Sequence, residues 1–234
     1  MKNFVVILGI GIVLLGGAFY LLSSDNEKEL ATSKIGAASE MSQESTETME
    51  PGRYTADTNA SVVTWQAGKP AIVGYVHTGT FSLQSGEIEL SNESLTGEFV
   101  LDMDSIKLTS LGGGKAGQES MLEGHLKAEG FFDIESYPTA TFRIVDVSPK
   151  VLPGPDQSEY TATGELTLKG QTNSLSFPMR VVVNNDNEVW MYASLTIDRT
   201  LWGVNAGSAS VADRITDNII GDDVEIDIEM KLVK

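Results

Sequence analysis

Only two histidines occur in this chain of 234 residues, and each lies among residue types that could do chemistry. His125 is followed four positions later by Glu129, so on a continuous helix the two side chains would share one face. A zinc site usually needs three or four ligands, and His77 could join this pair only if the fold brought it there. The chain has no cysteine to supply a thiolate ligand. The spacing therefore does not predict a metal site.

Two other features could suggest catalysis, but each lacks a residue that the chemistry requires. Residues 111–117, LGGGKAG, resemble a phosphate-binding loop, but such a loop needs Ser or Thr after its lysine, and Ala116 follows Lys115 here. A serine nucleophile would need an elbow such as G-x-S-x-G, which the sequence lacks. We therefore interpret residues 111–117 as a flexible loop that leads into a helix, and we expect no catalytic residue and no cofactor.

Residues 123–142, EGHLKAEGFFDIESYPTATF, gather the densest mixture of polar and aromatic side chains. Phe131 and Phe132 would plug the core where a helix meets the rest of the fold, or would form a lid over a ligand cavity. Gly130 is expected to break the helix, and Pro138 to start the next strand. His77 has two interpretations as well: a strand histidine satisfied by a nearby polar group, or a polar anchor inside a pocket.

The elements that would position these residues are strands, because apolar and polar residues alternate with a period of two. In residues 224–233 the apolar positions form one face and the charged positions form the other. The same alternation recurs in residues 95–103, 160–168, 175–183 and 189–197. Short turn-forming segments separate these runs, which predicts antiparallel hairpins and roughly eight to ten strands. Pro178 indicates an edge position or a bulge, and the one sustained helical pattern covers residues 117–127.

An all-β sandwich and a closed barrel both fit this pattern. Closure would remove the exposed strand edges of a long antiparallel sheet. An eight-stranded barrel has an interior that can hold one small ligand. The bulky residues on the expected inward faces would either line such a cavity or fill it: Trp65, Tyr75, His77, Phe81, Phe99, Leu101, Phe142, Leu166, Phe177, Met179 and Met191.

The N-terminal part of the chain differs from the rest. Residues 4–22 contain no charged side chain and would span roughly one bilayer core as a helix. Lys2 precedes this stretch and acidic residues follow it, so residues 1–24 are expected to anchor the chain with its C-terminal part outside the cytoplasm. A signal peptide that is cleaved, releasing the protein into the periplasm, is the rival interpretation. Residues 25–52 are acidic and rich in Ser and Thr, which predicts a disordered tether; residues 53–234 form the folded domain.

The overall charge narrows the possible partners. The formal net charge is -17 and the pI is about 4.4, so a nucleic-acid partner is not expected, because phosphate binding needs clustered Lys and Arg. Such an acidic surface suits a water-facing, extracytoplasmic domain.

Several ordered motifs resemble the YceI-like family, also called the polyisoprenoid-binding or lipid-binding YceI domain. The resemblance is carried by GHLKAEGFFDIESYPTATFRI at 124–144, TATGELTLKGQTNSLSFP at 161–178 and LTIDRTLWGV at 195–204, and it extends over residues 53–234. The motifs are most similar to Bacteroidetes-type members. Gly130 stands where the family usually has an aspartate, so no carboxylate role carries over to that position.

The resemblance implies a lipocalin-like, extended antiparallel β-barrel with about eight strands and one short helix. It implies an elongated apolar cavity for an isoprenoid or fatty-acyl chain, with no metal and no reaction. We therefore expect an extracytoplasmic binding or carrier protein rather than an enzyme. A lipid-modifying enzyme or isomerase that uses the same cavity, and a ligand-free interaction scaffold, are the alternatives. The oligomeric state is not predicted.

Overall fold

The computed structural model describes residues 49–92, 94–149, 160–184, 186, 188–209 and 219–234. The expected N-terminal anchor, and all but the last four residues of the expected tether, lie outside this part. Among the described residues, no helix is both long enough and apolar enough to cross a membrane.

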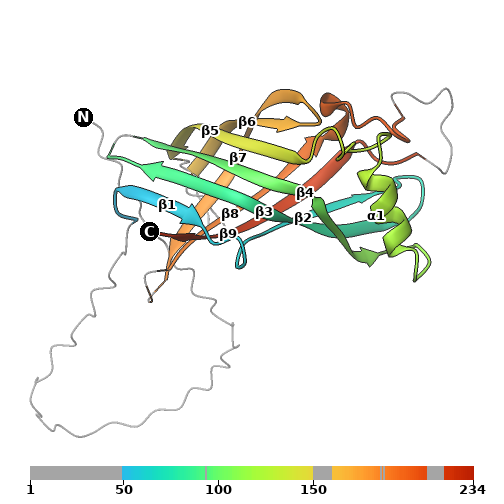
Figure 1. Ribbon diagram of the computed structural model, residues 1–234, viewed down its shortest axis with the longest axis horizontal. Helices are drawn as coiled ribbons and strands as arrows, with labels where there is room; N and C mark the ends of the chain where they lie inside the picture. Colours follow the sequence, from blue (N-terminus) through green and yellow to red (C-terminus); the bar gives the residue numbers. More distant parts are fainter. Residues whose placement is uncertain (1–48, 93, 150–159, 185, 187, 210–218) are drawn as a thin grey trace, which may run out of the picture.

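Strands dominate the described part of the chain, as the period of two predicts (Figure 1). It contains nine strands, one α-helix and one short 3-10 helix. In chain order these are β1 Gly52–Ala56, β2 Val62–Gly68, β3 Val76–Leu90, β4 Leu95–Leu111, α1 Glu119–Lys127, β5 Thr139–Pro149, β6 Tyr160–Leu168, β7 Gln171–Val183, β8 Val189–Asp198, η1 Arg199–Trp202 and β9 Asp223–Val233.

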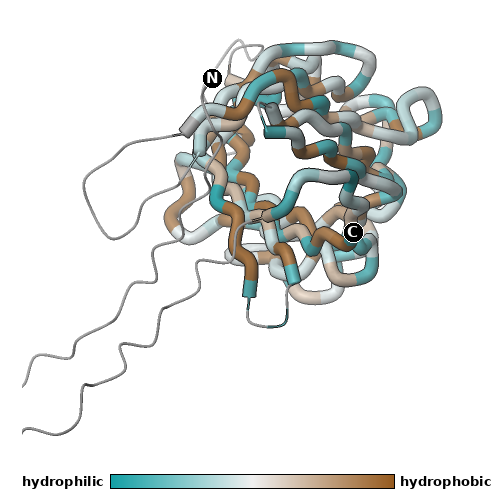
Figure 2. The backbone as a smooth tube through the Cα atoms, turned by 90° about the vertical axis from the view of Figure 1, so that its left-hand side faces the viewer, coloured by the Kyte–Doolittle hydropathy of each residue, from teal (hydrophilic) through white to brown (hydrophobic). Residues whose placement is uncertain are grey.

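The strands form one antiparallel sheet that closes on itself. Each strand from β3 to β8 pairs with the next one along the chain, and β2 closes the ring by pairing with both β3 and β9. The short β1 also lies between β3 and β9, further along both strands, so β1 and β2 share one position of an eight-position barrel. Seen end-on, the strands form a continuous ring (Figure 2). The closed barrel with about eight strands and one α-helix is confirmed.

The segment around α1 differs from the expectation in detail. The helix begins at Glu119 and ends at Lys127, with Ala128 already extended, so it stops before Gly130 rather than at it. Glu129 therefore does not continue the helical face of His125. The backbone turns through Asp133, whose φ of 51° is left-handed, and β5 begins at Thr139, directly after Pro138.

Pro178 lies inside β7, opposite Thr161 of β6. The ladder between β7 and β8 covers only residues 179–183 of β7, so Pro178 stands where β7 loses its neighbour on the β8 side. Because proline has no N–H to donate, this is a position where a strand tolerates it. The expected edge position is thus observed, but only on one side of the strand.

Candidate functional site

The barrel encloses two adjoining cavities, which we call the mouth cavity and the deep cavity and which together form the lumen. The mouth cavity has a volume of about 420 Å³ and reaches the surface at the end where α1 lies. The deep cavity has a volume of about 110 Å³, and every residue that lines it is apolar. Four residues line both cavities: Val63, Leu101, Ala140 and Ile226. The lumen is therefore one apolar interior with an opening at one end.

The inward-facing residues predicted from the sequence are brought together around this lumen. Seven of them line the mouth cavity: Trp65, Tyr75, His77, Phe81, Leu101, Phe131 and Phe132. Leu101 and six others line the deep cavity: Phe99, Phe142, Leu166, Phe177, Met179 and Met191. That these side chains contact a lipid stays a prediction. The half-buried Phe131 and Phe132 both pack against the core and line the mouth cavity, so the two roles considered for them coincide.

Inward-facing glycines explain why such bulky side chains leave a lumen at all. Three aromatic rings share one arrangement, in which the ring lies over a glycine of a neighbouring strand: Trp65 over Gly79, Phe99 over Gly86 and Phe142 over Gly164. A Cβ added at any of these glycines would lie only 2.4–2.5 Å from the ring, far inside van der Waals contact. The glycines therefore let the rings lie along the wall instead of projecting across the interior.

Trp65 and His77 line the mouth cavity, but one ring nitrogen of each is covered by surrounding protein atoms. Trp65 Nε1 and His77 Nδ1 are both buried, and neither makes a hydrogen bond with a described residue. Burial, and to a smaller extent the charge of Lys69, lower the pKa of His77, so its ring is neutral at neutral pH. The ring also lies edge-on to Tyr75, with 4.7 Å between the centroids. A buried polar atom without a partner costs free energy. Both nitrogens are covered by protein atoms, so a polar group of a ligand would reach them only after the rings shift.

The buried cation Arg199, by contrast, uses all its N–H donors in hydrogen bonds within the protein. Its guanidinium has five N–H donors, and it makes five hydrogen bonds, to the carbonyls of Val204, Ala206, Ile220 and Gly221 and to the carboxylate of Asp222. Burial lowers the pKa of Arg199, and the nearby carboxylates oppose that shift. Arg199 lines the mouth cavity but has no donor left for a ligand, so its role is to fold the chain at the mouth.

Sequence reasoning did not single out Arg199. The signal was present in LTIDRTLWGV, where an arginine follows a buried strand and Trp202 comes three residues later. Trp202 is completely buried and donates its indole N–H to the carbonyl of Leu166. Together these two residues attach the segment after β8 to the barrel.

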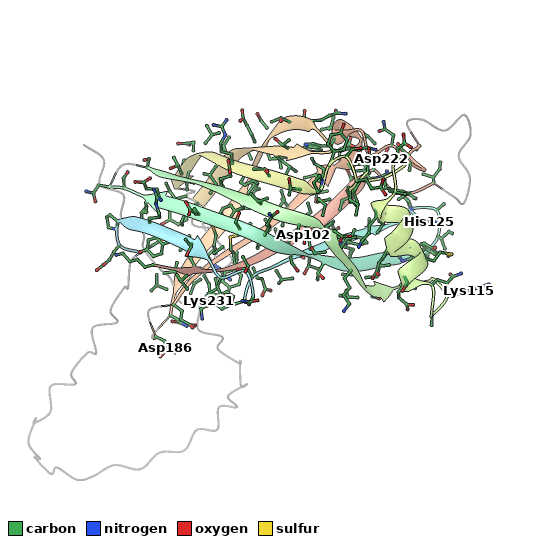
Figure 3. The ribbon with its side chains drawn as sticks, in the orientation of Figure 1. Asp102, Lys115, His125, Asp186, Asp222 and Lys231 are labelled. Atoms are coloured by element: carbon green, nitrogen blue, oxygen red, sulfur yellow. The ribbon has the colours of Figure 1, made fainter. Side chains whose placement is uncertain are left out.

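The second histidine lies at the rim of the mouth. His125 projects from α1 at the same end of the barrel as Asp222 and Lys115, whereas Lys231 and Asp186 lie toward the opposite end (Figure 3). His125 is exposed, lines the mouth cavity, and makes no hydrogen bond through its ring within the described residues. No cluster of three or more potential metal ligands occurs in the part of the chain that the structure describes.

A closed antiparallel β-barrel with an apolar interior is an architecture that can enclose a single small ligand. The chain belongs to the YceI-like domain family, whose model matches residues 54–232. That the chain is a Bacteroidetes-type member stays a prediction.

Two solved structures illustrate the likeness. BcnA from Burkholderia cenocepacia is 22% identical, with a TM-score of 0.55, over 76% of this chain and 99% of BcnA. A polyisoprenoid binding domain from Saccharophagus degradans, implicated in plant cell wall breakdown, is 18% identical, with a TM-score of 0.54, over 76% of this chain and 97% of that domain. At these identities the likeness shows the fold. Comparison with the curated proteins finds no match.

Proposed function

We propose that this protein binds an isoprenoid or fatty-acyl lipid, with the apolar chain in the lumen and the polar head group at the mouth. The observation that carries the proposal is the contrast inside the lumen. Its deep part is lined only by apolar residues, while its mouth is also lined by polar side chains, among them Lys69, Tyr75 and His77. A ligand with an apolar tail and one hydrogen-bonding group would satisfy both parts.

The energetics of such binding follow from the lining. Each methylene that leaves water for the lumen contributes about 0.8 kcal/mol, so affinity would grow with chain length while the chain still finds room. The polar atoms at the mouth would fix the orientation of the ligand and contribute less. Such a site selects a chain by its length and shape more than by its chemistry.

We further propose that the domain works on the extracytoplasmic side of a membrane, held there by residues 1–24 or released after their cleavage. The absence of charge in residues 4–22 and the acidic residues after them support this placement. At residues 49–50 the described chain is fixed to the barrel end remote from α1: Met49 is buried, and Glu50 accepts hydrogen bonds from Tyr54 and Lys234. A tether ending there would leave the mouth free. Protease digestion of intact and permeabilised cells, followed on the domain, tests the placement.

Native mass spectrometry of the gently purified protein tests the binding. We expect a copurified lipid, or stoichiometric binding when a prenyl alcohol or a fatty acid is titrated in. Trp65→Phe removes part of an aromatic ring that lines the mouth cavity and so reduces the apolar contact with a ligand; we expect weaker binding. The matched control is Trp190→Phe, which changes an indole on a face that neither cavity touches. Absence of any bound or titratable lipid would contradict the proposal.

A catalytic role for the same cavity has one observation in its favour, the neutral and unpartnered His77. Such a group could act as a base on a bound lipid. The two roles separate in a double variant of His77→Gln and His125→Gln. Binding alone predicts unchanged composition of lipids incubated with either protein, whereas turnover that the variant abolishes would favour the enzyme. A scaffold that binds no lipid is not favoured, because the lumen is open.

A further inference from the structure

The wall of the barrel is interrupted between β7 and β8. The ladder that joins them runs from the pair Val183–Val189 to the pair Met179–Ala193 and stops there. Residues 174–178 of β7 continue to pair with β6, and residues 194–198 of β8 continue to pair with β9. These two stretches have no ladder between them, and we call the interruption the seam.

The seam is bounded at both ends, so it is a window and not a split that runs to the rim. At one end it is closed by the last ladder pair, Met179 and Ala193. At the other end η1 crosses from β8 toward β7, where the side chain of Asn173 donates a hydrogen bond of 2.9 Å to the carbonyl of Leu201. The indole of Trp202 is fixed to β6 just beyond this point.

The inside and the outside of the wall meet at this window. A groove of about 500 Å³ lies on the outer surface along the seam, and it is lined in part by polar residues: Ser176, Ser194, Thr196, Glu225 and Asp227. Leu175, Phe177 and Leu195 line this outer groove and also line the deep cavity. The deep end of the lumen therefore reaches the outer groove with only these side chains between them.

The lumen is too small to enclose a long lipid chain completely, so a second opening at the seam would affect which chains can bind. The mouth cavity has a volume of about 420 Å³ and the deep cavity one of about 110 Å³, so the lumen can enclose a short apolar chain but only part of a much longer one. At the opposite end of the barrel, the described residues Tyr54, Ile88 and Leu232 are buried and pack closely. A longer chain therefore either extends out of the mouth or leaves the lumen through another opening.

We propose that the seam is a lateral portal, through which the tail of a long apolar chain leaves the deep cavity past Leu175, Phe177 and Leu195 while its head group stays at the mouth. The inference rests on the proposed lipid binding and adds the path of the chain to it. Two features of the seam favour a chain over an added peptide strand. Its inner side opens on a purely apolar cavity, and Pro178 removes a backbone donor from the edge that such a strand would need.

Closing the seam tests the portal. If the β7–β8 ladder continued in register, Ser176 would face Thr196, and both side chains line the outer groove. The chain has no cysteine, so the double variant Ser176→Cys/Thr196→Cys can be bridged selectively, by oxidation or by dibromobimane. The matched control, Thr163→Cys/Ser176→Cys, shares one position but bridges two residues that are already paired within the β6–β7 ladder.

The binding of two prenyl alcohols is then compared: farnesol, whose chain fits the lumen, and solanesol, which is far longer. For the bridged seam we expect solanesol affinity to fall by about tenfold or more, with farnesol affinity changed less than about twofold. The bridged control should bind both as the parent protein does. Solanesol bound equally well with the seam bridged would overturn the portal. If the open protein binds farnesol but not solanesol, the portal fails while the proposed function stands; if it binds neither, both fail.

A second measurement does not depend on bridging. A fluorophore on Ser176→Cys reports on the outer groove, and one on Lys115→Cys reports on the mouth end. With a fatty acid too long for the lumen that carries a nitroxide at its methyl end, we expect stronger quenching at position 176. With the nitroxide near the carboxyl group, we expect stronger quenching at position 115. The same preference for position 115 with both probes would show that the tail does not approach the seam, which overturns the proposal.

Discussion

The two ends of the barrel are built from different interactions. At the end opposite α1, apolar side chains from several strands pack until no space remains, and Ile88 there is only 1% exposed. At the mouth, α1 has no fully buried residue. Its Leu122 and Leu126 pack against the core while only partly buried, and polar contacts also attach it: the backbone N–H of Leu108 donates to Glu123, and Lys127 donates to the carbonyl and carboxylate of Asp104.

This difference explains why one end is shut and the other open. Apolar burial has no direction and gains most when every void is filled, so it closes the space between strands. Hydrogen bonds have preferred lengths and angles, so they can hold a segment beside an opening without drawing it in. The buried guanidinium of Arg199 does this at the mouth, because its hydrogen bonds join residues 204–206 to residues 220–222.

The largest effect is expected where the polar attachment of the mouth is removed. Arg199→Met takes away the only partner that the described contacts give to the carboxylate of Asp222 and to several carbonyls, so we expect a loss of about 3–5 kcal/mol in the free energy of unfolding. Urea denaturation followed by tryptophan fluorescence measures it. The control, Arg143→Met, breaks an exposed ion pair with Glu165 and should cost less than about 1 kcal/mol. Similar losses in both variants would mean that the buried network does not hold the mouth.

The apolar end should respond in stability alone. Ile88→Ala leaves a cavity in close packing, and we expect a loss of about 3 kcal/mol in the free energy of unfolding. Because Ile88 lines neither part of the lumen, lipid affinity measured well below the melting temperature should not change. The control, Val145→Ala, alters a side chain that is 54% exposed and should change stability by less than about 0.5 kcal/mol. A marked loss of lipid affinity in Ile88→Ala would show that the two ends are not independent.

The same contrast decides how much the sequence could predict. Strand faces are local: the alternation in residues 160–168 gives the bounds of β6, and the inward set it implies does surround the lumen. Where the alternation is broken, the prediction stopped early. The sequence predicted a strand over residues 95–103, but β4 continues to Leu111. In this second half of β4 the pairing with β3 contains register shifts, and these disturb the period of two. The polar contacts at the mouth join residues far apart in the sequence, such as Arg199 and Ile220, so no local sequence pattern predicts these contacts.

The sequence also did not predict that β1 and β2 share one position in the barrel. Each strand alone looks like an ordinary short strand, and only the length of β3 and β9, which pair with both, lets the two follow one another in the same place. The seam was indicated by Pro178 but not located by it. A proline within a strand indicates that one neighbouring strand is not hydrogen-bonded there. Only the observed pairing identifies that neighbour as β8.

The smallest effect should come from acid, and it should arise at the mouth through His77. Its pKa is lowered in the folded protein, so below its ordinary value of about 6.5 the unfolded chain binds more protons than the folded one. Stability is therefore retained above that pH and falls as the pH drops from about 6.5 toward the lowered pKa of the folded state. We expect the difference in melting temperature between neutral pH and about pH 5 to shrink in His77→Gln, measured by calorimetry without lipid. The control, His125→Gln, replaces a histidine on the exposed rim and should keep the parent difference. Equal pH dependence in the parent and His77→Gln would mean that the ring of His77 reaches solvent when it is protonated, and that the mouth opens more widely than the packing around His77 implies.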